Sequence, residues 1–262
     1  MTPAPPSQSI STTPSAGADR LMARTASPVQ GPAAQRSRWL APVLGLGALT
    51  ALIAFAVLAD GAMEGDDLSA YDPSVTSWMV AWRRGWLTGA AWVATHLGGA
   101  MSLTVITLVA AALFLRAGRI RHAAVLVAAM ISSSVVTVML KLIFARERPS
   151  IDLLLGDPAS TFSFPSGHSF NTAVLVGTLA GFVVFSGASR RWKVLAALAA
   201  IGAAGAVGLS RVYLAYHWLT DVLAGWSLAV AWLCLAALIV LQLRRVRPAA
   251  ARPGYARPSQ QG

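Results

Sequence analysis

Six long apolar stretches alternate with shorter polar segments along this chain. A helix needs about 20 mostly apolar residues to cross the hydrocarbon core of a bilayer, and every stretch supplies them. The second stretch contains the polar interruption Thr95–Gly99, so its start is poorly marked. The pattern predicts an all-α, polytopic membrane helix bundle with six transmembrane helices. The predicted spans are residues 40–59, 88–115, 122–144, 168–187, 194–212 and 218–243.

One segment between the first two spans has a different pattern. Residues 71–86 are too polar to cross the membrane, but Trp78, Trp82 and Trp86 recur every four residues and would share one face of a helix. Tryptophan side chains favour the interface between lipid and water. We therefore predict a short helix over 71–86 that lies in the outer interface.

The composition supports a membrane environment. Hydrophobic residues make up 56% of the 262 positions and charged residues 12%, with a mean hydropathy of +0.61. A soluble domain of this size needs more polar surface. The net charge of +11 is spread over short clusters between the spans, which argues against a nucleic-acid partner. The single cysteine, Cys234, cannot form an internal disulfide.

The basic clusters also predict the orientation and the division of the chain. They lie before span one and after spans two, four and six, so all four fall on one side of the membrane, which we expect to be cytoplasmic. We predict a plasma-membrane protein with a disordered cytoplasmic tail over 1–38, a membrane domain over 39–243 and a basic cytoplasmic tail over 244–262. The clusters are Arg36 and Arg38; Arg116, Arg119 and Arg121; Arg190, Arg191 and Lys193; and Arg244, Arg245 and Arg247.

Further cations lie at the outward end of span three, where the positive-inside tendency disfavours them. Lys141 and Arg148 are seven residues apart, so they share one face if the helix continues, and Pro149 is expected to end it. Arg146 lies between them and is a candidate contact for a lipid headgroup. The segment predicts two cations that point the same way near a helix end.

A turn follows at residues 164–169. Pro165, Ser166 and Gly167 are expected to form a tight turn into span four, whose free backbone N–H groups would bind an anion. His168 comes directly after the turn and is placed to handle a proton. Taken alone, the same residues also fit an ordinary helix cap by Ser166.

The third segment is residues 210–221. Arg211 closes span five, His217 opens span six, and Asp221 follows His217 by four residues, or one helical turn. A carboxylate at this spacing can accept the proton of one imidazole nitrogen and leave the other free to attack. In isolation the pair also fits an interfacial histidine with an incidental neighbour.

The three segments together favour a phosphate-like anion as the ligand. Several cations, a backbone anion nest, two histidines and a carboxylate should meet on one membrane face, and a phosphate needs that many donors. A histidine with an aspartate partner fits a nucleophile, and a second histidine without one fits a general acid.

These motifs resemble those of the phosphatidic acid phosphatase type 2 superfamily. The matching patterns are Lys-x6-Arg-Pro, Pro-Ser-Gly-His and Ser-Arg-x5-His-x3-Asp, which occur in that order between residues 141 and 221. The resemblance implies a membrane lipid phosphatase that needs no metal or other cofactor. Such an enzyme would hydrolyse a lipid phosphate or diphosphate monoester at the outer face through a phosphohistidine intermediate.

The resemblance also implies a role for each motif residue. His217 would attack phosphorus, Asp221 would orient and stabilise His217, and His168 would protonate the leaving oxygen and then help to activate water. The residues implied to hold the phosphate oxygens are Lys141, Arg148, Ser166, Gly167 and Arg211.

Other functions share parts of this pattern. A lipid phosphotransferase would pass the phosphoryl group to another lipid from the same site. An anion transporter would also place cations near span ends, but spans five and six carry almost no polar residues at the midplane. The intact His217, Asp221 and His168 argue against an inactive scaffold, and six spans argue against a soluble vanadate-dependent haloperoxidase.

The sequence leaves the substrate open, and it does not indicate an oligomeric state. The candidates are undecaprenyl diphosphate, phosphatidic acid, phosphatidylglycerol phosphate and diacylglycerol pyrophosphate. Recycling of a polyprenyl diphosphate is slightly preferred, because the site is expected to face outward and the compact six-span form resembles such family members.

Overall fold

The computed structural model describes residues 32–246, and all the described secondary structure is helical. The contacts divide the chain into residues 1–40 and 41–262, and the arrangement given below is that of the second part. The all-α prediction is confirmed for the described residues. The helices are α2 (Pro32–Glu64), η1 (Asp67–Tyr71), α3 (Asp72–Ala81), α4 (Gly85–Leu97), α5 (Ala100–Arg116), α6 (Ile120–Phe144), η2 (Ile151–Leu153), α7 (Gly167–Val184), α8 (Arg190–Tyr213) and α9 (Leu219–Val246).

Five helices, α2, α6, α7, α8 and α9, are each long and apolar enough to cross a membrane. The second predicted span, residues 88–115, is instead divided into α4 and α5, which meet at an angle of 56°. The break falls at Gly98 and Gly99, which cap the two helices, inside the polar interruption seen in the sequence. The number of spans is therefore six when α4 and α5 are counted as one.

The prediction of one interfacial helix over 71–86 is wrong in its extent. Helix α3 ends at Ala81, and Trp86 belongs to α4. The chain turns between the two helices, and within the turn the Arg83 guanidinium donates hydrogen bonds to the carbonyls of Leu153 and Tyr213. Of the three tryptophans, Trp78 and Trp82 remain neighbours, with ring centroids 5.7 Å apart.

The terminal helices extend beyond the predicted spans. Helix α2 begins at Pro32, within the segment predicted as a disordered tail, and α9 continues to Val246. Hydrophobicity predicts only the part of a helix that lies in lipid. Alanine, glutamine and arginine also have high helix propensity, so a helix that contains them can continue past the apolar stretch. The remainder of both predicted tails, residues 1–31 and 247–262, lies outside the described residues.

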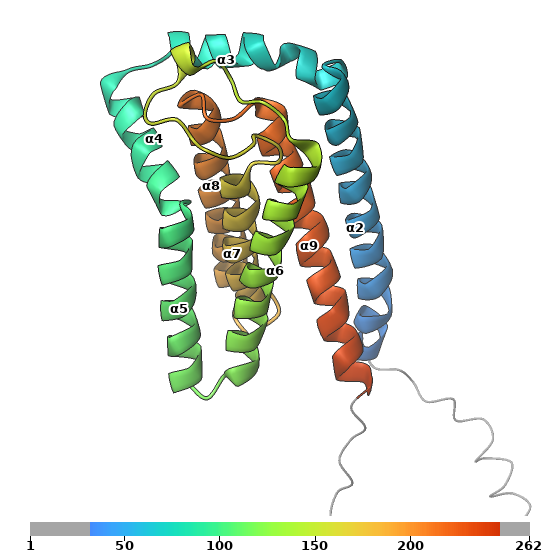
Figure 1. Ribbon diagram of the computed structural model, residues 1–262. Coiled ribbons are helices and arrows are strands. Elements are labelled where there is room, and N and C mark those ends of the chain that lie inside the picture. Colours follow the sequence, from blue (N-terminus) through green and yellow to red (C-terminus); the bar gives the residue numbers. More distant parts are fainter. Residues whose placement is uncertain (1–31, 247–262) are drawn as a thin grey trace, which may run out of the picture. The chain divides into compact units, whose positions relative to one another are not determined.

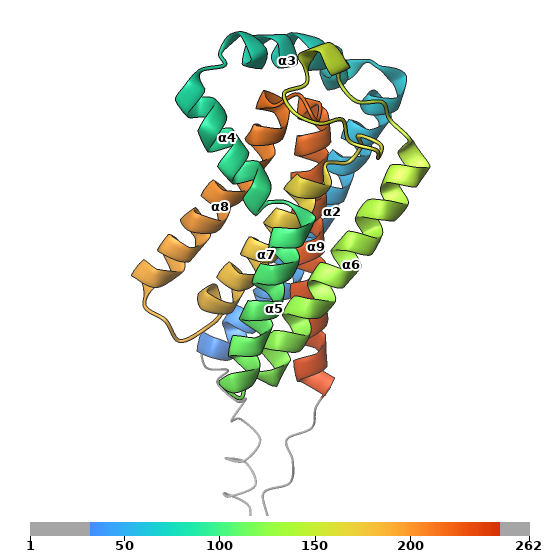
Figure 2. The same cartoon turned by 60° about the vertical axis from the view of Figure 1, so that its left-hand side comes forward.

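Helix α7 is the central helix of the bundle, and it packs against α6, α8 and α9. Its contacts form a core with α5, α6 and α9 that includes Leu103, Leu126, Phe170, Val174 and Leu228. In both views, α3 and the segment between α6 and α7 lie at the same end of these helices (Figure 1 and Figure 2). The polar, irregular parts of the chain that carry the predicted motifs therefore gather at one end.

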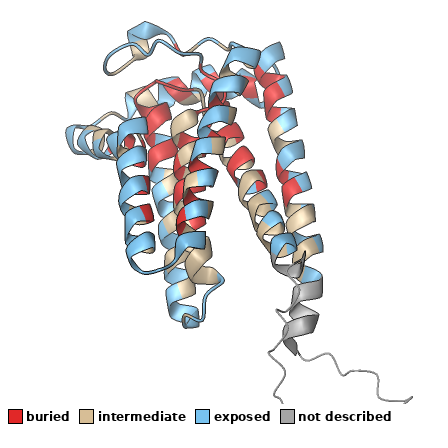
Figure 3. Ribbon diagram, turned by 60° about the horizontal axis from the view of Figure 1, so that its bottom comes forward, coloured by how far each residue is buried: buried red, intermediate tan, exposed pale blue. Residues whose placement is uncertain are grey.

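The outward faces of the helices are apolar, as lipid contact requires. Large apolar side chains on these faces are not covered by the rest of the protein. Leu113, Ile201 and Ile239, for example, have exposed fractions of 62%, 70% and 60%. Buried positions lie mainly on the inward faces of the helices (Figure 3). The protein is a multi-pass membrane bundle.

Helix α9 passes close to the start of α7 at Gly225. A Cβ atom there would lie 2.9 Å from the carbonyl oxygen of Ser166 and 3.1 Å from Cβ of Ser169. Beside this contact, the backbone N–H of Ser166 donates to the carbonyl of Asp221. The absence of a side chain at Gly225 thus allows two predicted motifs to meet.

We expect Gly225→Ala to destabilise the protein by about 1–3 kcal/mol, because the added methyl group meets backbone that cannot rotate away. Gly181→Ala in α7 is the matched control, since a Cβ there has no neighbour within 4 Å. Thermal unfolding of both variants in detergent measures the effect. Equal melting temperatures for the two variants would contradict the packing assigned to Gly225.

Candidate active site

The three predicted motifs meet at the end of the bundle that carries α3. They come from the C-terminal end of α6, the segment that follows it, the start of α7 and the turn between α8 and α9. His217 lies in that last turn and is 2% exposed, and Asp221 in the first turn of α9 is completely buried.

His217 and Asp221 form the contact that their spacing predicts, although the helix begins only after His217. Nδ1 of His217 lies 3.1 Å from Oδ2 of Asp221. The same carboxylate oxygen accepts a hydrogen bond of 3.0 Å from the backbone N–H of Trp218, which is half of a capping box at the start of α9. The helix cap and the histidine therefore share one carboxylate, which fixes the imidazole in place.

The other imidazole nitrogen is directed toward a cation. Nε2 of His217 lies 3.5 Å from Nη1 of Arg148. Burial lowers the pKa of His217 well below its usual value, and the positive charges of Arg148, Lys141 and Arg211 lower it further. The ring is therefore neutral around pH 7. Because the guanidinium can only donate, the lone pair of Nε2 faces Arg148 and Nδ1 holds the proton.

Lys141 and Arg148 meet in a different way from the one predicted. Helix α6 ends at Phe144, because Ala145 adopts a left-handed conformation with φ of 44°, and Arg148 follows in a segment without regular secondary structure. The prediction that the helix runs to Pro149 is therefore wrong. The two cations converge instead on the next part of the chain, where both donate to the carbonyl of Phe162.

The turn at residues 164–169 serves as a helix cap and also lies in the site. Ser166 is completely buried, and its hydroxyl accepts hydrogen bonds from the backbone N–H and the hydroxyl of Ser169. Gly167 begins α7 beside Lys141, with its missing Cβ position 4.0 Å from Cε of that lysine. His168 lies against the break between α4 and α5, where a Cβ on Gly99 would be 3.9 Å from Nε2 of His168.

Arg211 is buried at the end of α8 and is held from two sides. Its Nη1 donates to Oγ1 of Thr95 at 2.5 Å, and its guanidinium stacks 3.9 Å from the ring centroid of Tyr216. Its Nε–H has no hydrogen-bond partner among the described residues. A buried donor without a partner is costly, so this atom is available to an anionic ligand.

Around Asp221 lie three residues with no predicted role and one, Arg146, with a different predicted role; the three are Ser163, Asp72 and Thr220. The hydroxyl of Ser163 donates to Oδ2 of Asp221, and Arg146 forms an ion pair with Oδ1 at 2.6 Å. Arg146 also pairs with Asp72 at 2.9 Å, and Asp72 accepts two hydrogen bonds from Thr220. The suggestion that Arg146 contacts a lipid headgroup is therefore wrong, because buried carboxylates occupy both ends of its guanidinium.

Within residues 32–246, no group of three or more His, Cys, Asp or Glu side chains is arranged to hold a metal ion. Each carboxylate at the site is engaged by a cation or a hydroxyl group instead. The donors at the site are consequently suited to an anion rather than to a metal ion.

The comparisons with known proteins agree on one family. The profile of the PAP2 superfamily matches residues 122–245. Phosphatidylglycerophosphatase B of Bacillus subtilis (strain 168) is 30% identical over 182 residues, which are 68% of this chain and 88% of that protein. The chain belongs to the PAP2 superfamily. Accordingly, this PAP2 protein is a hydrolase that acts as a lipid phosphatase in the membrane.

Solved structures extend the PAP2 match to the fold. The crystal structure of a transmembrane PAP2-type phosphatidylglycerolphosphate phosphatase from Bacillus subtilis has a TM-score of 0.69 and 28% identity, and the match covers 76% of this chain and 98% of that one. The crystal structure of Aquifex aeolicus LpxE is more distant, with 22% identity, a TM-score of 0.48 and coverage of 66% and 94%. The predicted membrane helix bundle agrees with the fold of the Bacillus subtilis enzyme.

The lowered pKa of His217 predicts how hydrolysis depends on pH. We expect kcat/KM to persist as the pH falls past 6.5, the ordinary pKa of histidine, and to drop only when the pH passes through the lower pKa of the buried ring. Initial rates between pH 4 and 8 test this, with unfolding followed at each pH as a control. Titration of the His217 ring itself near 6.5 in folded protein, followed by NMR so that the substrate phosphate does not contribute, would contradict it.

Proposed function

We propose that this PAP2 enzyme hydrolyses a lipid phosphate through a phosphohistidine on His217. The observation that carries the proposal is the His217 ring, in which Nδ1 is held 3.1 Å from a buried carboxylate while Nε2 is directed toward Arg148. A neutral imidazole held in this way is oriented as a nucleophile, and its partner carboxylate stabilises the positive charge that the ring gains on attack.

The reaction would proceed in two displacements at phosphorus. In the first, Nε2 of His217 forms a bond to phosphorus while the bond to the lipid oxygen breaks, and His168 gives a proton to that oxygen. In the second, His168 takes a proton from water, the water oxygen bonds to phosphorus, and the bond between phosphorus and Nε2 breaks. His168 and His217 then have their starting protonation, and the products are the lipid alcohol and inorganic phosphate.

The cations would neutralise the phosphoryl oxygens during both steps. Lys141, Arg148 and Arg211 reach the site from three different parts of the chain. Ser166 and the N–H of Gly167, at the start of α7, complete the proposed phosphate site. Because phosphoryl transfer depends mainly on positioning and charge neutralisation, three fixed cations can take the role that a metal ion has in other enzymes.

Phosphatidylglycerol phosphate is the first substrate to test. The supporting observation is the similarity to phosphatidylglycerophosphatase B, of which the match covers 88%. Undecaprenyl diphosphate and phosphatidic acid present the same terminal phosphate to the site. Comparison of kcat/KM for the three lipids tests the choice, and a preference of tenfold or more for another lipid would overturn it.

Phosphate release should depend on His217 and not on a metal ion. We expect the purified protein to release phosphate from the lipid in excess chelator, and His217→Ala and Asp221→Asn to lose about 10³- to 10⁴-fold or more in kcat. Trapping with ³²P-labelled lipid should label wild-type protein, and His217→Ala should stay unlabelled. The proposal would be contradicted if chelator abolished activity and added metal restored it, or if the His217→Ala variant became labelled. Phosphate release that occurs only when an acceptor lipid is added would indicate a phosphotransferase.

We also propose that the site faces outward and that both termini are cytoplasmic, as the basic clusters indicate. Two exposed serines allow a matched test: Ser160 lies in the segment between α6 and α7, and Ser189 precedes α8 at the opposite end of α7. In a Cys234→Ala background, a membrane-impermeant thiol reagent should label Ser160→Cys in intact cells and Ser189→Cys only after permeabilisation. The reverse pattern would place the site in the cytoplasm.

A further inference from the structure

A chain of three charged groups, two of them buried and one largely shielded, extends from the candidate nucleophile to the start of α3. The Arg146 guanidinium pairs with Asp221 at 2.6 Å and with Asp72 at 2.9 Å. The side chains of Arg146, Asp72 and Asp221 are 11%, 2% and 0% exposed. A pair this well shielded from water is not screened as a surface ion pair would be.

Arg146 and His217 use different oxygens of the same carboxylate. Oδ2 of Asp221 faces His217, whereas Oδ1 accepts only the Arg146 guanidinium among the described residues. Arg146 therefore holds the carboxylate at the one rotation that presents Oδ2 to Nδ1 of the imidazole. Without it, Oδ1 would be a buried charge with no partner, and the carboxylate could turn or take up a proton.

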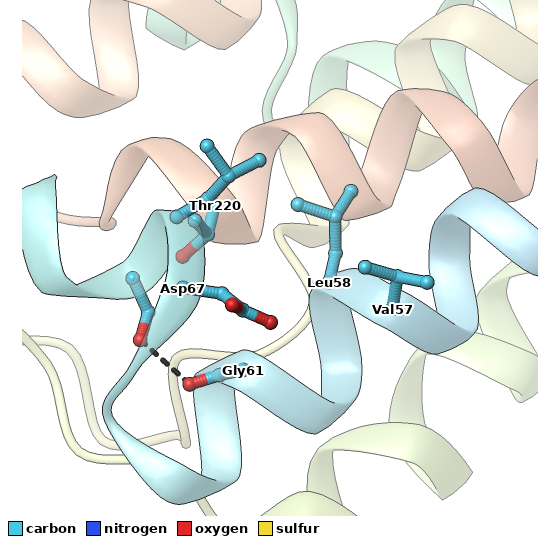
Figure 4. Close-up of a pocket in the computed structure, with 7 residues that line it drawn as sticks. Val57, Leu58, Gly61, Asp67 and Thr220 are labelled. Atoms are coloured by element: carbon cyan, nitrogen blue, oxygen red, sulfur yellow. Dashed lines mark hydrogen bonds between the residues drawn. The ribbon is translucent and has the colours of Figure 1, made fainter.

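Asp72 holds Arg146 and the first turn of α9 at the same time. Its Oδ1 accepts the backbone N–H of Thr220 at 3.0 Å, and its Oδ2 accepts the Thr220 hydroxyl and the Arg146 guanidinium. Thr220 also lines a small pocket beside Gly61 and Asp67, where the end of α2 meets α9 (Figure 4). Asp72 is thus the point at which α3, α9 and the segment after α6 are fastened together.

The charges around Asp221 are separated into two groups. Behind it, Arg146 lies between two carboxylates, so those three groups carry a net charge of −1. On the imidazole side lie the cations and the second histidine. Arg148 contacts His217 there, and Lys141, Arg211 and His168 are the other titratable groups whose charge acts on its ring.

We propose that Arg146 and Asp72 are positioning residues for the phosphatase reaction: Arg146 keeps Asp221 ionised and correctly rotated behind His217, and Asp72 holds Arg146 in place. This role rests on the proposed function, because it requires His217 to be the nucleophile. Neither residue touches the substrate in this scheme, so both should act on the rate and on its pH dependence more than on KM.

Two substitutions separate the charge of Arg146 from its geometry. Arg146→Gln removes the positive charge and the two-sided contact with the carboxylates. A proton then binds the His217–Asp221 pair more readily, so we expect the acid limb of kcat/KM to move up by roughly one to two pH units. We also expect kcat to fall about 100-fold as the imidazole loses its fixed position. Arg146→Lys keeps the charge but reaches one carboxylate, so kcat should fall while the acid limb stays within about half a unit of its wild-type position.

Asp72→Asn should move the acid limb in the opposite direction. It removes a negative charge behind Asp221, so protonation becomes harder and the limb shifts to lower pH. The double variant Asp72→Asn with Arg146→Gln restores the wild-type net charge, so its limb should lie between those of the single variants while kcat stays low. A loss of packing alone would not give shifts of opposite sign.

Arg83→Gln is the matched control. Arg83 also joins separate segments at this end of the bundle, through the carbonyls of Leu153 and Tyr213, but it contacts no carboxylate among the described residues. We expect it to keep the wild-type pH profile. Detergent unfolding curves for every variant identify those that fail to fold, and Arg146→Lys, which keeps the buried charge balanced, provides the measurement if Arg146→Gln is unstable.

The outcomes distinguish this inference from the function on which it rests. If His217→Ala loses activity while Arg146→Gln keeps the wild-type kcat and acid limb, the positioning role is wrong and the proposed function stands. Shifts of the same sign in Asp72→Asn and Arg146→Gln would also overturn the role. If His217→Ala retains activity, the proposed function itself fails.

Discussion

The buried carboxylate of Asp221 is the constraint on which the rest of the site depends. An ionised carboxylate without partners is too costly to bury, so the fold must bring donors to it from whatever segments lie near. Its donors are Arg146 and Ser163 from the segment after α6, and His217 and the Trp218 N–H from the turn before α9. Satisfying this one charge therefore fixes two irregular segments against each other and sets the orientation of the imidazole.

The location of the site follows from the solvent around the helices. Backbone groups within the hydrocarbon core must be hydrogen-bonded inside a helix, so irregular backbone that can present carbonyls and turns to a ligand is confined to the ends of spans. The left-handed residues Ala145 and Ala215 lie in such places, directly after α6 and between α8 and α9. Lipid headgroups lie at the same depth, which brings a lipid phosphate to a region where the chain can surround it.

The spans and the contact between His217 and Asp221 could be predicted, because hydrophobicity and short spacing act within one segment of the chain. The residues that support this contact could not. Asp72 lies more than 70 positions before its partner Arg146, and no periodicity links residues so far apart, because their contact depends on how helices cross at the end of the bundle. The one available signal was that Arg146 lies where the positive-inside tendency disfavours a cation, which called for a reason without naming a partner.

The hydrogen bonds of the free site indicate why a phosphate would be selected over a neutral ligand. Arg148 donates to the carbonyls of Thr161 and Tyr216, and Lys141 donates to that of Phe162, so both cations are already satisfied by backbone dipoles. A neutral hydroxyl group would exchange one dipole for another and gain little. An anionic phosphoryl oxygen forms charge-assisted hydrogen bonds with these cations that are about twice as strong as hydrogen bonds between neutral groups. The cost of displacing the carbonyls is therefore offset only when the incoming group carries negative charge.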